Sequence, residues 1–211
     1  MKRIFTLVLI LFTAASLMAE VIEKTYYFGN PKTEIKGNQQ LISFDNTLSS
    51  GIAGEPSLPY HAVNLLLPPG HEAIRISFEG FDEITLPGYF KLMPAQFSRP
   101  LSDPGIPVFI ENEQVYRSLE IYPASATGNL STQYMNGYGF AQSVFTPVRY
   151  IPGTGEISYY RSVTIRIETR ETSRGLQALN NLTSTDRVKL SCSKNAQNPD
   201  VLSSYPERRT T

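Results

Sequence analysis

A repeated alternation of apolar and polar residues limits what this chain can fold into. Residues 73–78 read AIRISF and residues 163–168 read VTIRIE, so that Ile74, Ile76 and Phe78, for example, share one side of an extended backbone. A period of two is typical of half-buried β-strands, with one face toward a core and the other toward water. Residues 63–68, VNLLLP, are almost continuously apolar, which indicates a strand buried on both faces.

Glycine and proline separate these strand patterns at short intervals. Turn signals lie at residues 68–70, 87–88, 104–105 and 152–155. The last of them joins residues 143–151 to residues 156–168 and predicts a long hairpin. Several short strands with such turns favour an all-β fold, and we expect an antiparallel β-sandwich of the jelly-roll-like type with a mostly irregular C-terminal tail.

The pattern changes near residue 170. Residues 168–198 are polar and lack the alternation, so we interpret residues 171–211 as a linker or connector that follows a sandwich domain at 20–170. One short helix is expected within it, because Asn198 is a good cap, Pro199 suits a first helical position and Pro206 lies beyond the end.

The N-terminus indicates export. Lys2 and Arg3 precede an apolar run that ends at Met18, and Ala19 offers a small residue for cleavage. We therefore interpret residues 1–19 as a signal peptide and expect a secreted protein, periplasmic, cell-surface or extracellular, with no membrane contact after the signal is removed. The net charge is zero, which gives no indication of a nucleic-acid partner.

Residues with catalytic chemistry are few. His61 and His71 flank an apolar stretch and are interpreted as surface or rim histidines, because their spacing matches no metal motif. Cys192 has no second cysteine to pair with and lies in the polar tail, so we interpret it as a bystander thiol. We expect no catalytic residue, no metal and no cofactor, and hence no enzyme activity from these residues alone.

Two segments together resemble a known family. Residues 54–70, GEPSLPYHAVNLLLPPG, and residues 145–168, FTPVRYIPGTGEISYYRSVTIRIE, are similar in order and spacing to the N-terminal pro-domain of gingipain-type (family C25) cysteine peptidases. The resemblance implies a β-sandwich that inhibits a caspase-like catalytic domain and assists its folding until proteolysis removes it. Its partner would be that cognate domain, in cis or in trans, with a Cys/His dyad that these 211 residues do not include.

The resemblance also assigns a role to one loop. Residues 93–107 read MPAQFSRPLSDPGIP, and in the arginine-specific members the position that matches Arg99 enters the primary specificity pocket. A guanidinium group can form a forked pair with a carboxylate in such a pocket. Pro100 would follow the scissile bond and lacks an N–H, so we expect Ser98, Arg99 and Pro100 to form an inhibitory loop that resists cleavage. The simpler interpretation is that Arg99 is a hydrated surface side chain.

Release from the peptidase would need a cleavage site. Arg170, Arg174 and the pair Arg208 and Arg209 lie in the segment interpreted as a linker, and accessible, flexible backbone is where proteolysis concentrates. These four arginines are therefore candidate processing sites.

An alternative function is a free-standing exported β-sandwich that binds protein or carbohydrate. Its binding face would be aromatic, although sheet packing is the favoured interpretation for most of these tyrosines, because they lie in or beside strand patterns. The candidate residues are Tyr116, Tyr122, Tyr134, Tyr138, Tyr159 and Tyr160. A catalytic domain encoded after residue 211 would favour the pro-domain, and a stop codon would favour the free-standing module.

Overall fold

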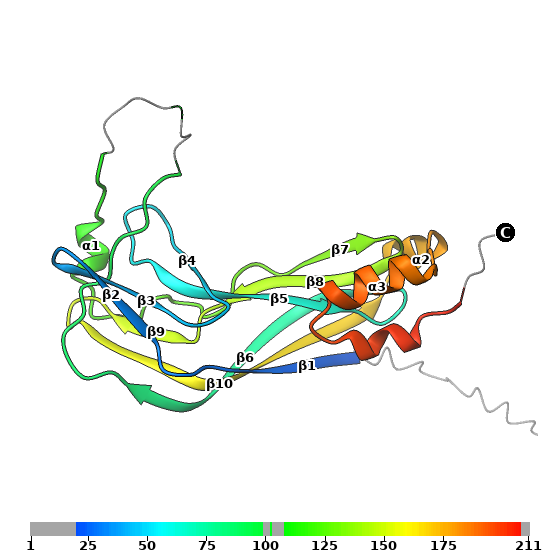
Figure 1. The fold of residues 1–211 in the computed structure, drawn as a ribbon, viewed down its shortest axis with the longest axis horizontal. Helices are drawn as coiled ribbons and strands as arrows, with labels where there is room; N and C mark the ends of the chain where they lie inside the picture. Colours follow the sequence, from blue (N-terminus) through cyan, green and yellow to red (C-terminus); the bar gives the residue numbers. More distant parts are fainter. Residues whose placement is uncertain (1–19, 99–101, 103–107, 208–211) are drawn as a thin grey trace, which may run out of the picture.

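The structure is a computed structural model that describes residues 20–98, 102 and 108–207; the predicted signal peptide lies outside these residues. Two antiparallel sheets stack face to face in an elongated sandwich (Figure 1). The first sheet contains β1 (Glu20–Tyr27), β10 (Glu156–Glu171) and β6 (His71–Thr85), with β9 (Val148–Ile151) also paired to β10. The second has the order β4 (Leu48–Ser50), β5 (Leu58–Leu66), β8 (Tyr138–Phe145) and β7 (Ser131–Met135).

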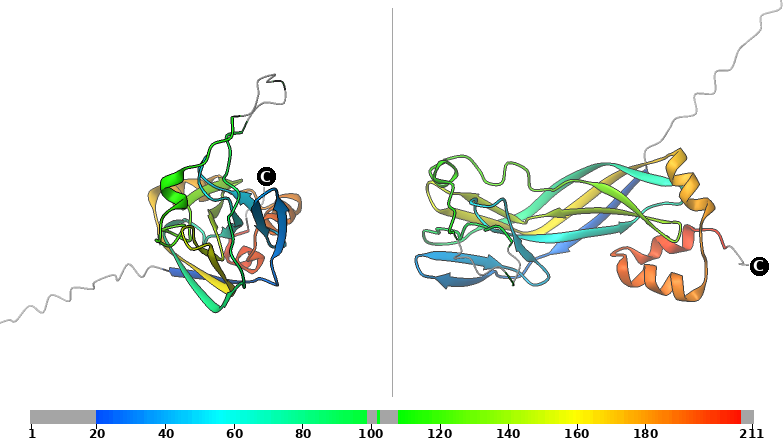
Figure 2. Two further views of the ribbon diagram at one scale, coloured as in Figure 1. Left: turned by 90° about the vertical axis from the view of Figure 1, so that its left-hand side faces the viewer. Right: turned by 90° about the horizontal axis from the view of Figure 1, so that it is seen from above.

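Smaller elements complete the two ends of the sandwich. The hairpin of β2 (Lys32–Lys36) and β3 (Gln39–Ser43) and the short helix α1 (Glu113–Tyr116) lie at one end. The helices α2 (Ser173–Asn180) and α3 (Asp186–Asn195) and the 3-10 helix η1 (Pro199–Ser204) lie at the other, as the right-hand view of Figure 2 shows.

The expected sandwich and its alternating strands are confirmed. Val163, Ile165 and Ile167 of β10 are fully buried and pack with Val63 and Leu65 of β5 in the main core between the two sheets. The predicted hairpin is formed by β9 and β10, which pair from Val148 opposite Tyr159 to Ile151 opposite Glu156. The hydrophobic face of each sheet therefore supplies one half of the core.

Ile74 departs from the alternation and is 45% exposed, although Ile76 and Phe78 of the same strand pack against the core. A register shift explains the difference, because Thr169 of β10 pairs with Ala73 while Glu168 pairs with Arg75. The extra residue of this β-bulge is Ile74, and a bulge turns the side chain away from the face that the strand period assigns to it.

The segment after β10, interpreted from the sequence as a linker or connector, lies against the sandwich. Its short helices, joined by irregular stretches, pack onto the outer face of the second sheet. They bury Leu66, Tyr138 and Phe140 in a second cluster with Leu182, Cys192, Ala196 and Tyr205. The run VNLLLP explains why the outer face is covered. Leu65 packs in the main core, whereas Leu66 points to the outer face and is buried there by the C-terminal segment. No helix in the described part of the chain is long and apolar enough to cross a membrane.

Residues 197–205 hold this C-terminal segment to the edge of β5. The predicted short helix is present as η1, with Pro199 at its first turn. Asn198 occupies the N-cap position, but its side chain makes no capping hydrogen bond. The Asn198 side chain accepts a hydrogen bond from the backbone N–H of Leu66 and donates one to its carbonyl, at 2.7 and 2.9 Å. Gln197 bonds the backbone of Asn64 and Ala62 in the same way. The two side-chain amides thus form the hydrogen bonds that a neighbouring strand would otherwise form with this edge of β5.

His61 lies in the middle of β5 and is half-buried, not at the rim as the sequence suggested. Val63 and Leu65 of the same strand face the main core, and the imidazole packs against the rings of Tyr26, Phe28 and Phe145. Its Nδ1 lies 2.8 Å from the carbonyl oxygen of Ala62. Burial lowers the pKa of His61 below its ordinary value of 6.5.

We expect this histidine to make the fold less stable in mild acid. Because the pKa of His61 is lower in the folded chain, the unfolded chain takes up the proton first, and the free energy of unfolding falls as the pH drops through about 6.5. Urea unfolding at pH 7.5 and 5.5 measures the difference. His61→Phe should make the two values more alike; an unchanged pH dependence would contradict the assignment to His61.

Candidate functional site at the base of the 97–109 loop

The residues that lead into the 97–109 loop are fixed by the sandwich. The backbone N–H of Met93 donates to the carbonyl of Gln40 in β3, and the Met93 carbonyl accepts from Ser57, at 2.9 and 2.8 Å. Leu92 is fully buried in the main core. Although proline keeps this stretch out of regular strands, its backbone groups are paired on both sides.

Gly54 joins the two sides of the loop base. Its N–H donates to the carbonyl of Ala95 before the loop, and its carbonyl accepts from the N–H of Asn112 after it, both at 2.7 Å. Gly54 has a φ of +88°, which favours glycine, and an added Cβ would lie 3.1 Å from Ile110 Cγ2. The glycine of the GEPSLP motif is therefore required by the backbone at the loop base.

The Gln96 side chain closes the base directly. Its Nε2 donates to the carbonyl of Ile110 at 2.8 Å, and its Oε1 accepts from the N–H of Ile110 at 2.9 Å. Tyr116 of α1 adds a second link through a 2.6 Å hydrogen bond from its hydroxyl to the carbonyl of Leu92. Burial raises the pKa of the Tyr116 hydroxyl, so it remains a donor at neutral pH.

Large apolar side chains surround this base without being buried. Phe97 on one side and Val108 and Phe109 on the other are all exposed, next to the exposed Ser98. Exposed apolar groups gathered at one place mark surfaces that contact other proteins. Arg99 and Pro100, the remaining members of the predicted inhibitory loop, lie outside the described residues.

Two of the candidate processing arginines lie in regular structure instead of flexible backbone. Arg170 pairs with Glu72 within the ladder between β10 and β6. Arg174 lies in the first turn of α2, where its guanidinium binds Glu72 at 2.9 Å and lies 5.3 Å from the centre of the Tyr134 ring. Both side chains are exposed, but the argument from flexible backbone does not hold at these two positions. Arg208 and Arg209 lie outside the described residues.

The cysteine, His71 and the candidate tyrosines make packing or hydrogen-bond contacts within the fold. Cys192 is fully buried in the second cluster, and burial raises the pKa of its thiol. His71 at the start of β6 lies 3.0 Å from the hydroxyl of Thr169 through its Nδ1. The tyrosines proposed as an aromatic binding face are all buried or half-buried, as their packing in strands suggested; they are Tyr116, Tyr122, Tyr134, Tyr138, Tyr159 and Tyr160.

Sequence reasoning did not identify the residues that build the loop base. Gln96 and Tyr116 act through contacts between segments that are distant along the chain, and neither belongs to a recognisable local motif. Gly54 carried a weak signal, since glycine is the residue that most readily adopts a positive φ at a turn.

We expect Gly54→Ala to destabilise the chain by about 1–3 kcal/mol, the usual cost of a strained backbone conformation. The matched control is Gly29→Ala, because an added Cβ there meets no atom within 4 Å. Urea unfolding of the two variants measures the difference in free energy. Equal stability of both variants would contradict the role of Gly54 at the loop base.

Comparison with known proteins agrees with this architecture. The family model Propeptide_C25 matches residues 27–193. A solved structure described as the complex of Porphyromonas gingivalis RgpB pro- and mature domains is similar with a TM-score of 0.64 and 15% identity. It covers 88% of this chain and 96% of that chain. One on the zymogenic latency of gingipain K from Porphyromonas gingivalis has a TM-score of 0.60 and 19% identity, over 72% of this chain and 88% of that one.

A search of curated proteins found no match. At these identities the two solved structures show the fold, and the family model shows the relationship. The resemblance to gingipain-type pro-domains predicted from the sequence is thereby confirmed.

Proposed function

This chain belongs to the C25 propeptide family, and we propose that it holds a gingipain-like cysteine peptidase inactive until proteolysis removes it. The partner is the cognate caspase-like catalytic domain, on which the chain acts as inhibitor and folding assistant. Export by the predicted signal peptide would bring both to the periplasm, the cell surface or the medium.

The observation that carries this proposal is the construction of the loop base. Gln96, Gly54 and Tyr116 link the two sides of the loop base. Each of them forms hydrogen bonds to backbone groups of the segments before or after the loop. A loop whose base is held by the fold before binding loses less conformational entropy on docking at that base, which favours tight inhibition. The exposed Phe97, Val108 and Phe109 next to it supply apolar area for the contact.

Within this loop we assign the pocket contact to Arg99, on the sequence motif alone. A guanidinium pairs with a carboxylate through two parallel hydrogen bonds, which gives both affinity and orientation. Pro100 contributes by its chemistry, because a peptide bond to proline has no N–H on the leaving group. The loop would then occupy the active site without being cleaved readily.

We propose that release occurs at Arg208 or Arg209. Arg170 and Arg174 lie in hydrogen-bonded strand and helix, and a protease would have to unfold that structure before cutting. N-terminal sequencing of the activated peptidase tests the assignment. A new terminus after Arg170 or Arg174 would contradict it.

The continuation of the gene tests the function itself. A reading frame that proceeds past residue 211 into a domain with a Cys/His dyad is the expected result. A stop codon at that point, with no such domain encoded nearby, would contradict the proposal and favour a free-standing binding module.

A further inference from the structure

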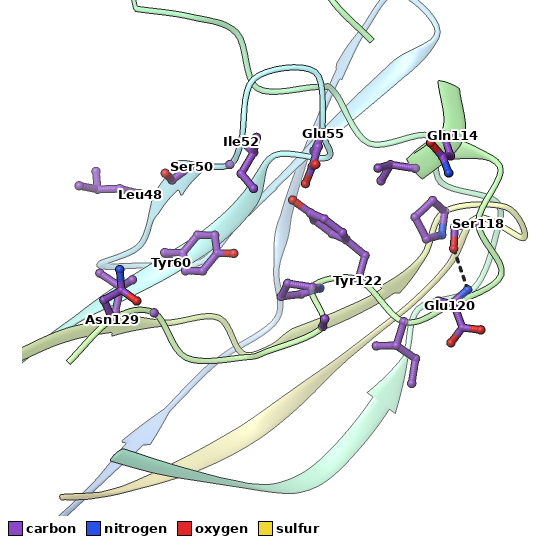
Figure 3. Close-up of a pocket in the computed structure, with 18 of the residues that line it drawn as sticks. Leu48, Ser50, Ile52, Glu55, Tyr60, Gln114, Ser118, Glu120, Tyr122 and Asn129 are labelled. Atoms are coloured by element: carbon purple, nitrogen blue, oxygen red, sulfur yellow. Dashed lines mark hydrogen bonds between the residues drawn. The ribbon is translucent and has the colours of Figure 1, made fainter. Parts of the chain in front are cut away.

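A large groove lies on the outer face of the second sheet, at the end next to α1. Its floor consists of cross-strand neighbours, since Leu48 of β4 is opposite Tyr60 of β5, and Ala62 of β5 is opposite Val144 of β8. The cavity measures about 1170 Å³ (Figure 3). Its walls come from residues 50–55 and from residues 114–129.

One half of this sheet face is covered by the chain itself, and the other half is open. At one end, the C-terminal helices cover Leu66, Tyr138 and Phe140. At the groove end the face is equally apolar but open, with Leu48 79% exposed and Val144 also exposed. An open apolar sheet face beside one that the chain covers itself indicates a surface that another polypeptide covers.

The charged side chains that line the groove are acidic. Glu55 and Glu120 line it, whereas no lysine, arginine or histidine does so among the described residues. Neither carboxylate takes part in a salt bridge within the described part of the chain. Glu55 points toward the Tyr122 hydroxyl beside Tyr60, as Figure 3 shows. Burial first, and the Glu55 charge second, raise the pKa of both hydroxyls, which remain hydrogen-bond donors. A cation placed here would meet an acceptor that has no cationic partner.

The groove is continuous with the loop base. The backbone carbonyl of Glu55, in the groove wall, accepts a hydrogen bond from the N–H of Ala95 at 2.8 Å, and the Gly54 backbone bonds both Ala95 and Asn112. Helix α1, which Asn112 caps, supplies Gln114 and Val115 to the opposite wall. A protein that engages the loop base therefore lies beside the open groove.

We propose that this groove binds a segment of the mature peptidase in which bulky apolar side chains flank a lysine or arginine. The apolar side chains cover Leu48, Tyr60 and Val144, and the cation pairs with Glu55. This inference rests on the proposed inhibitory function and adds a second contact, independent of the specificity pocket, that selects the cognate enzyme.

Leu48→Lys tests the contact. The substitution places a cation in the groove and removes an apolar contact, and it carries little risk to folding because Leu48 is so exposed. The control is Ile35→Lys on β2, where an apolar side chain is 72% exposed outside the groove. Binding of the 20–211 chain to the mature peptidase, measured by calorimetry, should weaken about tenfold or more for Leu48→Lys and by less than about twofold for Ile35→Lys.

Glu55→Gln tests the cation. Glutamine can still accept a hydrogen bond from Tyr122 but carries no charge, so affinity should fall severalfold and depend less on salt concentration than in the parent. The control is Glu156→Gln, at an exposed site outside the groove, which should leave the salt dependence unchanged.

The outcomes separate the two claims. If the parent binds and inhibits the peptidase while Leu48→Lys and Glu55→Gln behave like their controls, the groove proposal is wrong and the inhibitory function stands. If the parent chain itself does not bind the peptidase, both are wrong.

Discussion

Replacing Arg99 by alanine is expected to weaken inhibition of the cognate peptidase by about thirtyfold or more. Removing one partner of a buried, hydrogen-bonded charge pair typically costs about 2–5 kcal/mol, because the carboxylate left in the pocket is desolvated without a counter-charge. Each 1.4 kcal/mol is about a tenfold change in the inhibition constant. The measurement is that constant for the variant and parent 20–211 chains, with circular dichroism to verify equal folding.

Two further substitutions at the same loop distinguish charge, geometry and cleavage. Arg99→Lys keeps the positive charge but loses the forked geometry, so its inhibition should fall between parent and Arg99→Ala. Pro100→Ala restores the N–H after Arg99 and should convert the loop into a substrate, cut between residues 99 and 100. An Arg99→Ala chain that inhibits as well as the parent would reject the pocket assignment.

Asn198→Ala is expected to destabilise the fold by about 2–4 kcal/mol. The side chain pairs with both backbone groups of Leu66 in a buried environment, and each buried polar group left without a partner costs about 1–3 kcal/mol. The loss should also loosen η1 and Tyr205, whose hydroxyl donates to the Leu67 carbonyl and accepts from the Gly139 N–H. Urea unfolding of the 20–211 chain measures the effect.

The control for this prediction is Asn195→Ala. Asn195 is exposed at the end of α3, and its side chain bonds only the Ser191 carbonyl one turn earlier among the described residues. Substitutions of this kind usually change stability by less than about 0.5 kcal/mol. If Asn198→Ala unfolds at the same urea concentration as Asn195→Ala, the C-terminal segment is not held to β5 in the way described.

The β-sandwich could be predicted because its signal is local. The alternation in VTIRIE places Val163, Ile165 and Ile167 in the core, and the turn at residues 152–155 fixes the hairpin of β9 and β10. The same rule failed at Ile74, where a bulge that depends on the partner strand shifts the register. The local alternation of residues predicts that a strand forms, whereas the register of its pairing depends on the neighbouring strand.

The C-terminal helices and the loop base depend on contacts between residues far apart in the sequence. Local sequence patterns therefore did not predict them. Leu182, Cys192 and Tyr205 are too widely spaced to form a helical stripe, and only the sheet beneath makes them a cluster. One local signal was available, because Thr172 and Thr185 each cap a helix with a side-chain oxygen. Another was the run VNLLLP, whose second buried face implied a cover.

The central claim is that this chain inhibits a C25 peptidase. The most direct test mixes the purified 20–211 chain with its cognate mature C25 peptidase and measures residual activity on an arginine-containing peptide and on a lysine-containing peptide. We predict tight, concentration-dependent inhibition of a peptidase that prefers arginine, reversed when the chain is degraded. Full activity at a large molar excess of intact chain would contradict the claim.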